Sequence, residues 1–196
     1  MALINIKLRN NLKKIIDSNI EEILLFGSVA REKDRPNDTD IMIIYKDKIN
    51  KEIELEIKKE IEKYYKNVVI TSKNSNNIFD ETFDARENIL FEGISLIDNK
   101  KIAEKYGFSS IGMFNYETKK LTNLQKTKFY YALNGRNDEG LLKKLKSVKL
   151  SDNIILTPLN KTDELKELFE FWKIEYKYIP TMIPMRMKKI LFRNLS

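Results

Sequence analysis

Residues 24–28 read Leu-Leu-Phe-Gly-Ser, and residues 38–44, after a polar loop, read Asp-Thr-Asp-Ile-Met-Ile-Ile. An apolar run that stops at Gly27, and a second that opens with two carboxylates, predict two buried strands joined by a polar turn. Alternate residues of a strand point to the same face, so we expect Asp38 and Asp40 to share one side. Carboxylate oxygens bind Mg²⁺, and a glycine lets a phosphate approach the backbone. The two segments therefore predict a divalent-metal site beside a phosphate-binding turn.

The composition narrows the chemistry that this chain can perform. Its 196 residues include no Cys and no His, which excludes disulfides, thiolate nucleophiles, zinc sites built on Cys or His, and His general bases. A metal held by carboxylates alone is expected to be Mg²⁺ or Mn²⁺. No apolar run approaches the roughly 20 residues of a membrane span, so we expect a cytoplasmic protein.

Charge is distributed unevenly along the chain. Residues 1–98 carry 16 Lys and Arg against 19 Asp and Glu, a net charge of −3, whereas residues 99–196 carry 20 against 10, a net charge of +10. The basic half suggests a polyanionic partner such as nucleic acid. A Lys-rich composition that only solvates ordinary helices is the alternative. The candidate nucleic-acid contacts are Arg136, Lys143, Lys144 and Lys146.

Hydrophobic periodicity and turn residues predict an α/β chain: a small mixed sheet flanked by helices over residues 1–98, and a smaller basic α/β module over residues 99–196. Helices are expected over residues 4–18, 51–65, 83–91, 122–133, 138–146 and 162–172, and strands over 23–26, 39–45, 68–72, 94–98, 153–157 and 173–179. Residues 107–112, which contain two glycines, are expected to be a connector.

Individual residues of these elements carry further expectations. Gly93 is expected to end a helix in the left-handed conformation, and Thr162 is expected to cap the start of another. Helical spacing and aromatic content predict that the core of the second half includes Phe129, Tyr130, Leu133, Phe169, Phe171, Trp172 and Tyr176. The alternative for residues 126–136, where basic and aromatic residues interleave, is a surface that lies against a phosphate backbone, with Arg136 on the turn.

The Gly-Ser turn and the Asp-x-Asp strand resemble the nucleotidyltransferase superfamily of DNA polymerase beta, and most of all its small minimal nucleotidyltransferases from archaea and bacteria. The matching segments are residues 25–31 (LFGSVAR), 35–36 (RP), 38–41 (DTDI) and 89–98 (ILFEGISLID). The resemblance covers about residues 8–98. It implies a nucleotidyltransferase fold and transfer of a nucleoside monophosphate from an NTP, such as ATP, to an acceptor hydroxyl or phosphate.

The resemblance also implies roles for individual residues. Gly27 and Ser28 would hold the triphosphate with Arg31, and Asp38 and Asp40 would ligate two Mg²⁺ ions about 3.5–4 Å apart. RNA is the first acceptor that we expect, because of the basic half; a protein is the second, and a small aminoglycoside-like molecule the third. The alternative is a lapsed nucleotidyltransferase fold that only binds nucleic acid.

The loop between the two motifs departs from the family pattern. Its length allows a second register, in which Asp40 and Met42 align with the family's two aspartates and Met42 takes the place of a metal ligand. The apolar strand at residues 41–44 favours the register with Asp38 and Asp40. Glu32 stands where the family has a glycine, so we expect the loop to turn differently. Arg31 and Lys33 are candidate phosphate contacts there, although a solvated loop position is the favoured interpretation for Lys33.

The next strand departs from the pattern as well. Many family members carry a third carboxylate there, but residues 67–72 read Asn-Val-Val-Ile-Thr-Ser and contain no acid. The nearest alternatives are Asp80, Glu81 and Asp84, which precede a helix and are expected to cap it instead. Activity therefore depends on two aspartates.

Overall fold

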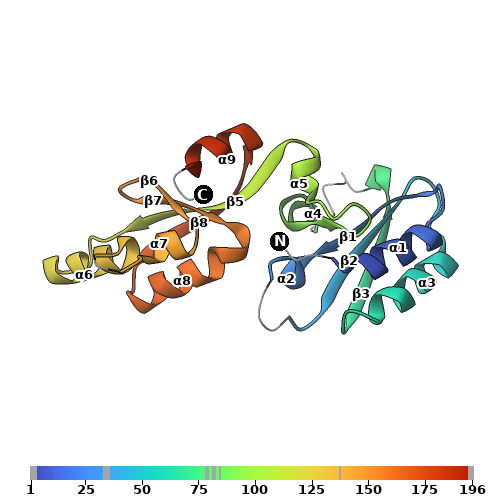
Figure 1. Cartoon of the computed structure of the whole chain (residues 1–196), viewed down its shortest axis with the longest axis horizontal. Helices are drawn as coiled ribbons and strands as arrows, with labels where there is room; N and C mark the ends of the chain where they lie inside the picture. Colours follow the sequence, from blue (N-terminus) through green and yellow to red (C-terminus); the bar gives the residue numbers. More distant parts are fainter. Residues whose placement is uncertain are drawn as a thin grey trace. The chain divides into compact units, whose positions relative to one another are not determined.

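The structure is a computed structural model that describes residues 4–32, 36–77, 80, 83, 85–136 and 138–193. The chain divides into two compact units, Met1–Tyr106 and Gly107–Ser196. Each unit is a four-stranded sheet with helices packed against it (Figure 1). The α/β class expected from the sequence is confirmed.

The first unit alternates helices and strands from its beginning. Its elements are α1 (Ile6–Ile15), β1 (Ile20–Phe26), α2 (Gly27–Ala30), β2 (Thr39–Tyr45), α3 (Lys51–Glu62), β3 (Val68–Asn74), the 3-10 turn η1 (Ser75–Asn77), α4 (Arg86–Glu92), β4 (Ile94–Ser95) and α5 (Ile102–Lys105).

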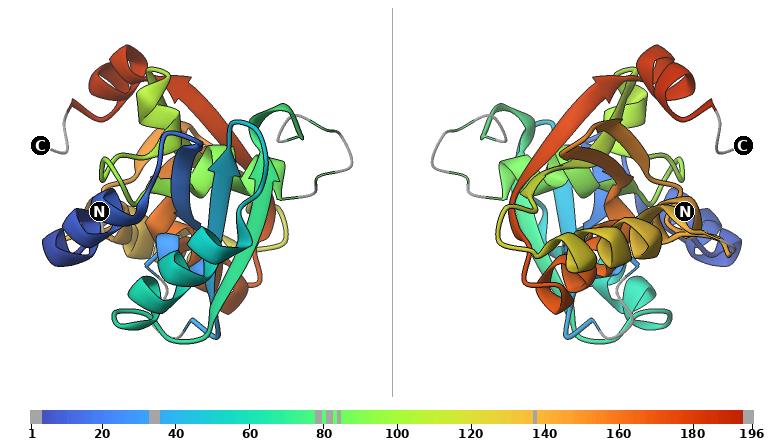
Figure 2. Two further views of the ribbon diagram at one scale, coloured as in Figure 1. Left: turned by 90° about the vertical axis from the view of Figure 1, so that its right-hand side faces the viewer. Right: turned by 90° about the vertical axis from the view of Figure 1, so that its left-hand side faces the viewer.

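The first sheet has the strand order β3-β2-β1-β4, with β2 parallel to β3 and β1 antiparallel to both of its neighbours. Helices α1 and α3 cover one face (Figure 2, left). The core on that face includes Leu8, Leu12, Ile23, Leu25, Ile41, Ile43, Ile57 and Ile61. Because strand residues alternate, the even-numbered positions of β2, Asp40 among them, belong to the other face.

Helices α4 and α5 pack on that other face. Leu24, Phe26, Met42 and Ile44 of the sheet form a second core there with Ile89 and Ile102. Lys105 of α5 also forms ion pairs with Glu22 and Asp98. These contacts tie α5 to the first unit, although α5 lies beyond residue 98, where we expected the first domain to end.

Gly93 ends α4 as expected, but not in the left-handed conformation. Its φ is −56°, so handedness does not explain the glycine. A Cβ at this position would overlap the carbonyl oxygen of Ile89, which accepts the Gly93 N–H at 2.9 Å. Close packing against the last turn of the helix is therefore the physical reason for the glycine.

The second unit consists of an antiparallel sheet and its helices. Its elements are β5 (Phe108–Glu117), α6 (Asn123–Asn134), α7 (Leu141–Lys144), β6 (Val148–Ser151), β7 (Ile154–Pro158), the 3-10 turn η2 (Leu159–Lys161), α8 (Thr162–Phe171), β8 (Glu175–Pro184) and α9 (Met185–Leu191).

The second sheet has the order β6-β7-β5-β8. Helices α6, α7 and α8 cover one face, and α9 lies on the opposite side against β5 and β8 (Figure 1; α6 and α8 face the viewer in Figure 2, right). Strand β8 runs through Pro180 and Pro184, whereas a break was expected after Ile179. Because β8 is an edge strand, it tolerates residues without an N–H.

Residues 107–112 are not the connector that the sequence suggested, because they enter β5, a central strand of the sheet. Gly112 pairs with Thr157 on one side and Pro180 on the other. A Cβ there would lie 2.6 Å from the Thr162 methyl group, so this glycine lets α8 begin close to the sheet.

Two aromatic residues expected in the second core are exposed. Phe129, Leu133 and Phe169 are buried as expected, but Tyr130 is 53% exposed and Phe171 is 80% exposed. Tyr130 directly follows the buried Phe129, and Phe171 lies two residues after the buried Phe169. Because successive helical residues point about 100° apart, these neighbours face away from the core.

The expectation that Thr162 caps the start of α8 is wrong. Its hydroxyl donates to the carbonyl of Leu159 (2.8 Å) instead.

Within the described ranges, no helix has both the length and the apolar character that crossing a membrane requires.

Candidate functional site

Gly27 brings the end of β1 against the start of β2. Phe26 pairs with Asp40 across the two strands, and the chain then turns into α2 at Gly27, whose φ is +73°. A Cβ on Gly27 would overlap the Oδ2 atom of Asp40 and lie 3.3 Å from its Cγ. The position therefore demands glycine twice, for its backbone conformation and for the space that the Asp40 carboxylate occupies.

Asp38 and Asp40 lie at the same end of β2. Asp38 is exposed and Asp40 is half-buried. Burial, followed by the charge of Asp38, raises the pKa of the Asp40 carboxyl above its usual value, and the Arg31 guanidinium partly opposes that rise. A carboxylate whose ionisation is disfavoured by a neighbouring negative charge favours a cation beside it.

Ser28 adds a hydrogen-bonding group beside this pair. Its hydroxyl oxygen is buried, and no donor or acceptor in the described part of the chain contacts it. Buried polar atoms are normally satisfied, so an unpartnered one indicates a position where a ligand would complete the hydrogen bonding. Next to it, the Gly27 backbone lies against the Asp40 carboxylate.

The donor set fits Mg²⁺ or Mn²⁺. Mg²⁺ is commonly held by one or two carboxylates together with substrate phosphates and water, and Asp38 and Asp40 supply two carboxylates beside the Gly27 turn. No cluster of three or more acidic side chains that could hold a metal occurs among the residues described. Asp38 and Asp40 would thus supply only part of a coordination shell, and phosphate oxygens would supply the rest.

Arg31 is fixed by a carboxylate that the sequence did not single out for a role. Its Nη1 donates to both carboxylate oxygens of Glu92, each at 2.7 Å, and the Glu92 side chain is only 12% exposed. Glu92 lies at the end of α4, which packs against α2. No sequence spacing indicates this pair, because 61 residues separate its members.

Residues 10–102 match the family model described as polymerase beta, nucleotidyltransferase. This segment is a nucleotidyltransferase domain of the polymerase beta superfamily. No curated protein and no solved structure gives a significant match to the chain. Membership supports nucleotidyl transfer in general and an NTP as substrate, in a family that is typically metal-dependent.

The nucleotidyltransferase domain lacks a third carboxylate on β3. In the parallel pairing, Val69 lies beside Asp40 and Thr71 beside Met42, so the β3 position beside the candidate ligand Asp40 carries an apolar side chain. Asp80 is exposed and lies in the segment after η1. Glu81, Asp84 and the candidate phosphate contact Lys33 lie outside the described residues.

Met42 does not lie where a metal ligand would. It is fully buried in the apolar core beneath α4, two residues further from the Gly27 turn than Asp40. This placement favours the Asp38 and Asp40 register over the Asp40 and Met42 register, because a cation needs oxygen ligands open to phosphate and water.

The four candidate nucleic-acid contacts of the second unit differ in their surroundings. Lys143 is paired with Glu139 at 3.1 Å, Lys144 and Lys146 are exposed, and the Arg136 guanidinium lies over the Tyr131 ring at 5.0 Å. Helix α7 is a single turn, shorter than the basic helix expected over residues 138–146. These four residues remain candidates for nucleic-acid contact.

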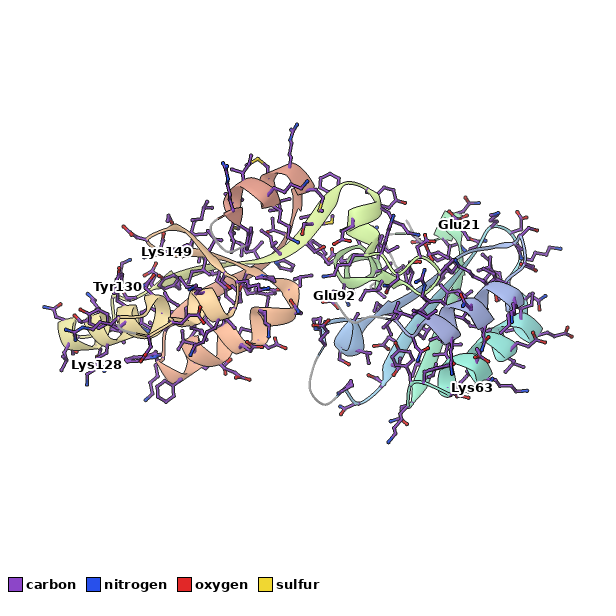
Figure 3. All side chains as sticks on the ribbon, viewed as in Figure 1. Glu21, Lys63, Glu92, Lys128, Tyr130 and Lys149 are labelled. Atoms are coloured by element: carbon purple, nitrogen blue, oxygen red, sulfur yellow. The ribbon has the colours of Figure 1, made fainter. Side chains whose placement is uncertain are left out.

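Neutralising Glu92 is expected to lower the stability of the nucleotidyltransferase domain. Glu92→Gln removes the charged acceptor from a largely buried ion pair, so the free energy of unfolding should fall by about 1–2 kcal/mol in urea denaturation. Glu21→Gln, on the exposed side of β1 (Figure 3), is the matched control and should change it little. Equal effects of the two substitutions would show that the pair with Arg31 contributes nothing.

Proposed function

We propose that residues 10–102 transfer a nucleoside monophosphate from an NTP to an acceptor hydroxyl or phosphate. The observation that carries this proposal is the close approach of Gly27 to the Asp40 carboxylate, next to the buried, unpartnered Ser28 hydroxyl. A cation-binding group and a phosphate-binding group are thus neighbours, which is the arrangement that nucleotidyl transfer requires.

Each residue has a distinct task in this proposal. Asp38 and Asp40 hold the divalent cation, and the Ser28 hydroxyl and the Gly27 turn bind the triphosphate. Arg31, oriented by Glu92, keeps a positive charge on the same side of the sheet. A bound Mg²⁺ or Mn²⁺ would supply the charge that stabilises the reacting phosphates and the pyrophosphate that leaves.

The acceptor that we favour is RNA, because residues 99–196 carry a net charge of +10. A protein acceptor is the second choice. Val69 in place of a third carboxylate favours the competing possibility, a lapsed fold that binds nucleic acid without transfer, because acceptor activation would then lack a dedicated base.

Label transfer separates these functions. The full-length protein is incubated with each of the four α-labelled NTPs, Mg²⁺, and either total RNA or total protein. We expect label in RNA from at least one NTP, and a loss of at least about 100-fold in the Asp38→Asn/Asp40→Asn variant. Asp47→Asn, an exposed carboxylate just beyond the other end of β2, is the matched control and should retain activity.

Label in protein instead of RNA would keep the transfer reaction and replace the acceptor. Absence of label from both pools with every NTP, in a protein that still binds RNA, would establish the lapsed fold. Label that persists in the double variant would contradict the roles assigned to Asp38 and Asp40.

A further inference from the structure

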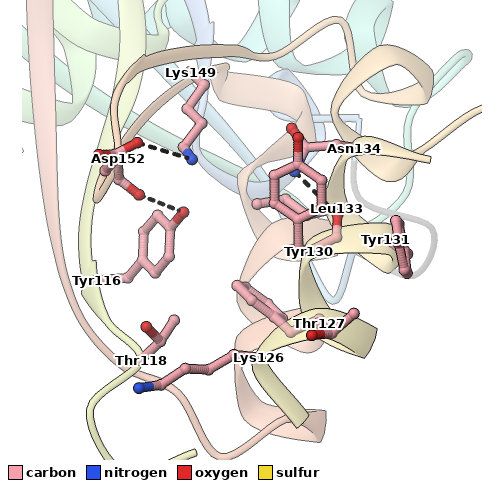
Figure 4. Close-up of a pocket in the computed structure, with 11 residues that line it drawn as sticks. Tyr116, Thr118, Lys126, Thr127, Tyr130, Tyr131, Leu133, Asn134, Lys149 and Asp152 are labelled. Atoms are coloured by element: carbon pink, nitrogen blue, oxygen red, sulfur yellow. Dashed lines mark hydrogen bonds and ion pairs between the residues drawn. The ribbon is translucent and has the colours of Figure 1, made fainter. Parts of the chain in front are cut away.

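A hollow lies within the second unit, between α6 and the end of the sheet. It has a volume of about 450 Å³, within the range of small-molecule sites. We call it the tyrosine pocket and define it by five of its lining residues: Tyr116, Lys126, Phe129, Tyr130 and Lys149. Figure 4 shows the Tyr116 and Tyr130 rings on opposite sides of this space.

The two tyrosines that line the pocket differ in how far their rings are exposed and held. Tyr116 is buried, and its hydroxyl donates to the Asp152 carbonyl oxygen at 2.9 Å. Tyr130 is half exposed and comes from the side of α6 opposite Lys128 (Figure 3). A fixed ring and an exposed ring form a site for a planar group, which would cover Tyr130 on binding.

Two lysines border the tyrosine pocket. Among the described residues, no carboxylate forms an ion pair with Lys126. In the same described ranges, the ion pair of Lys149 is with Asp152, at a long 3.6 Å, and the Asp152 carboxylate also lines the pocket. Residues 107–196 carry 17 Lys and Arg against 9 Asp and Glu. The surroundings are therefore cationic and attract an anionic ligand.

A second exposed ring continues the surface toward the end of α6. Tyr131 is 37% exposed, its centroid is 5.9 Å from that of Tyr130, and it carries the Arg136 guanidinium on its face. Tyr131 lines both the tyrosine pocket and an adjoining hollow that contains Arg136, Asp138 and Glu139. The two rings lie at 71° to each other, so each ring can stack with a base separately. Exposed aromatic rings with basic side chains nearby are typical of surfaces that bind single-stranded bases.

We propose that this surface binds single-stranded nucleic acid, with one unstacked base in the tyrosine pocket and the neighbouring phosphates at Lys126 and Lys149. A duplex does not fit the proposal, because its bases are stacked on each other and cannot enter a pocket. The inference rests on the second unit alone and does not require nucleotidyl transfer.

Fluorescence anisotropy of the full-length protein in EDTA, without NTP, tests the proposal independently of catalysis. The probes are a labelled 12-nucleotide RNA, the same sequence as DNA, and the corresponding duplex. We expect at least one single strand to bind more tightly than the duplex. Tyr130→Ala should weaken that binding about tenfold, since one stacked base is worth about 1–3 kcal/mol, and Lys126→Ala should reduce the salt slope by about 0.7.

Two control variants separate loss of the Tyr130 ring from other effects of a substitution. Tyr130→Phe retains the ring and should bind within about twofold of the wild type. Phe171→Ala removes an aromatic side chain that is even more exposed, on α8 and outside the pocket, and should leave binding unchanged. Equal losses in Tyr130→Ala and Phe171→Ala, tighter binding of the duplex, or no binding of either single strand at low salt would overturn the proposal.

Discussion

Gly27→Ala is expected to lower nucleotidyl transfer at least about 100-fold, because a misplacement of about 1 Å at a reacting centre can cost that much. The new Cβ would take the space of the Asp40 Oδ2 atom, so the carboxylate must move away from the turn that binds phosphate. The measurement is label transfer from the preferred NTP under saturating Mg²⁺.

Gly107→Ala separates displacement of Asp40 from backbone strain. Gly107 has a similar φ of +78°, but no atom lies within 4 Å of the position of an added Cβ. Both variants should lose about 1–2 kcal/mol of stability from the left-handed conformation, and only Gly27→Ala should lose activity. Full activity of a folded Gly27→Ala protein would contradict the assigned contact with Asp40.

Asp40→Asn is expected to stabilise the metal-free protein while it abolishes transfer. The pKa of Asp40 is raised in the folded state, mainly by burial and then by Asp38, so the native state holds this proton more tightly than the unfolded chain does. Stability therefore falls as the pH rises from the ordinary carboxyl value through the raised pKa, and asparagine avoids that loss.

The expected gain in unfolding free energy at pH 7 is about 0.5 kcal/mol, since Asp40 is partly solvated. Urea denaturation in EDTA should show it, and the difference from the wild type should shrink as the pH is lowered toward about 4. Asp47→Asn is the control for removal of an exposed charge. An Asp40→Asn protein less stable than the wild type at pH 7 would refute the raised pKa assigned to Asp40.

The sequence was informative where local patterns coincide with buried elements. Strand β2 has the bounds that its apolar run predicts, and Phe129 and Leu133 form the core as their helical spacing indicates. Expectations failed where tertiary contacts override composition. The two glycines and two serines of residues 107–112 predicted a connector, but Ser109 and Ser110 are buried in a central strand.

The residues of the candidate site also differ in whether the sequence could predict them. Gly27, Ser28, Asp38 and Asp40 could be proposed from sequence because they lie close together along the chain. Glu92 could not, because folding alone brings it to Arg31. The tyrosine pocket was underestimated for a related reason: helical spacing favoured a core position for Tyr130 over a surface one, and only the packing of α6 on the sheet leaves its ring exposed.

The most direct measurement is a titration with Mn²⁺ followed by electron paramagnetic resonance, with and without a non-hydrolysable ATP analogue, on the wild type and on the Asp38→Asn, Asp40→Asn and Asp47→Asn proteins. If Asp38 and Asp40 hold the cation beside the Gly27 turn, the wild type and Asp47→Asn will bind Mn²⁺, more tightly with the analogue present. Loss of either site carboxylate will weaken binding at least about tenfold. Wild-type Mn²⁺ affinity in Asp40→Asn would contradict the metal site at the centre of the proposed function.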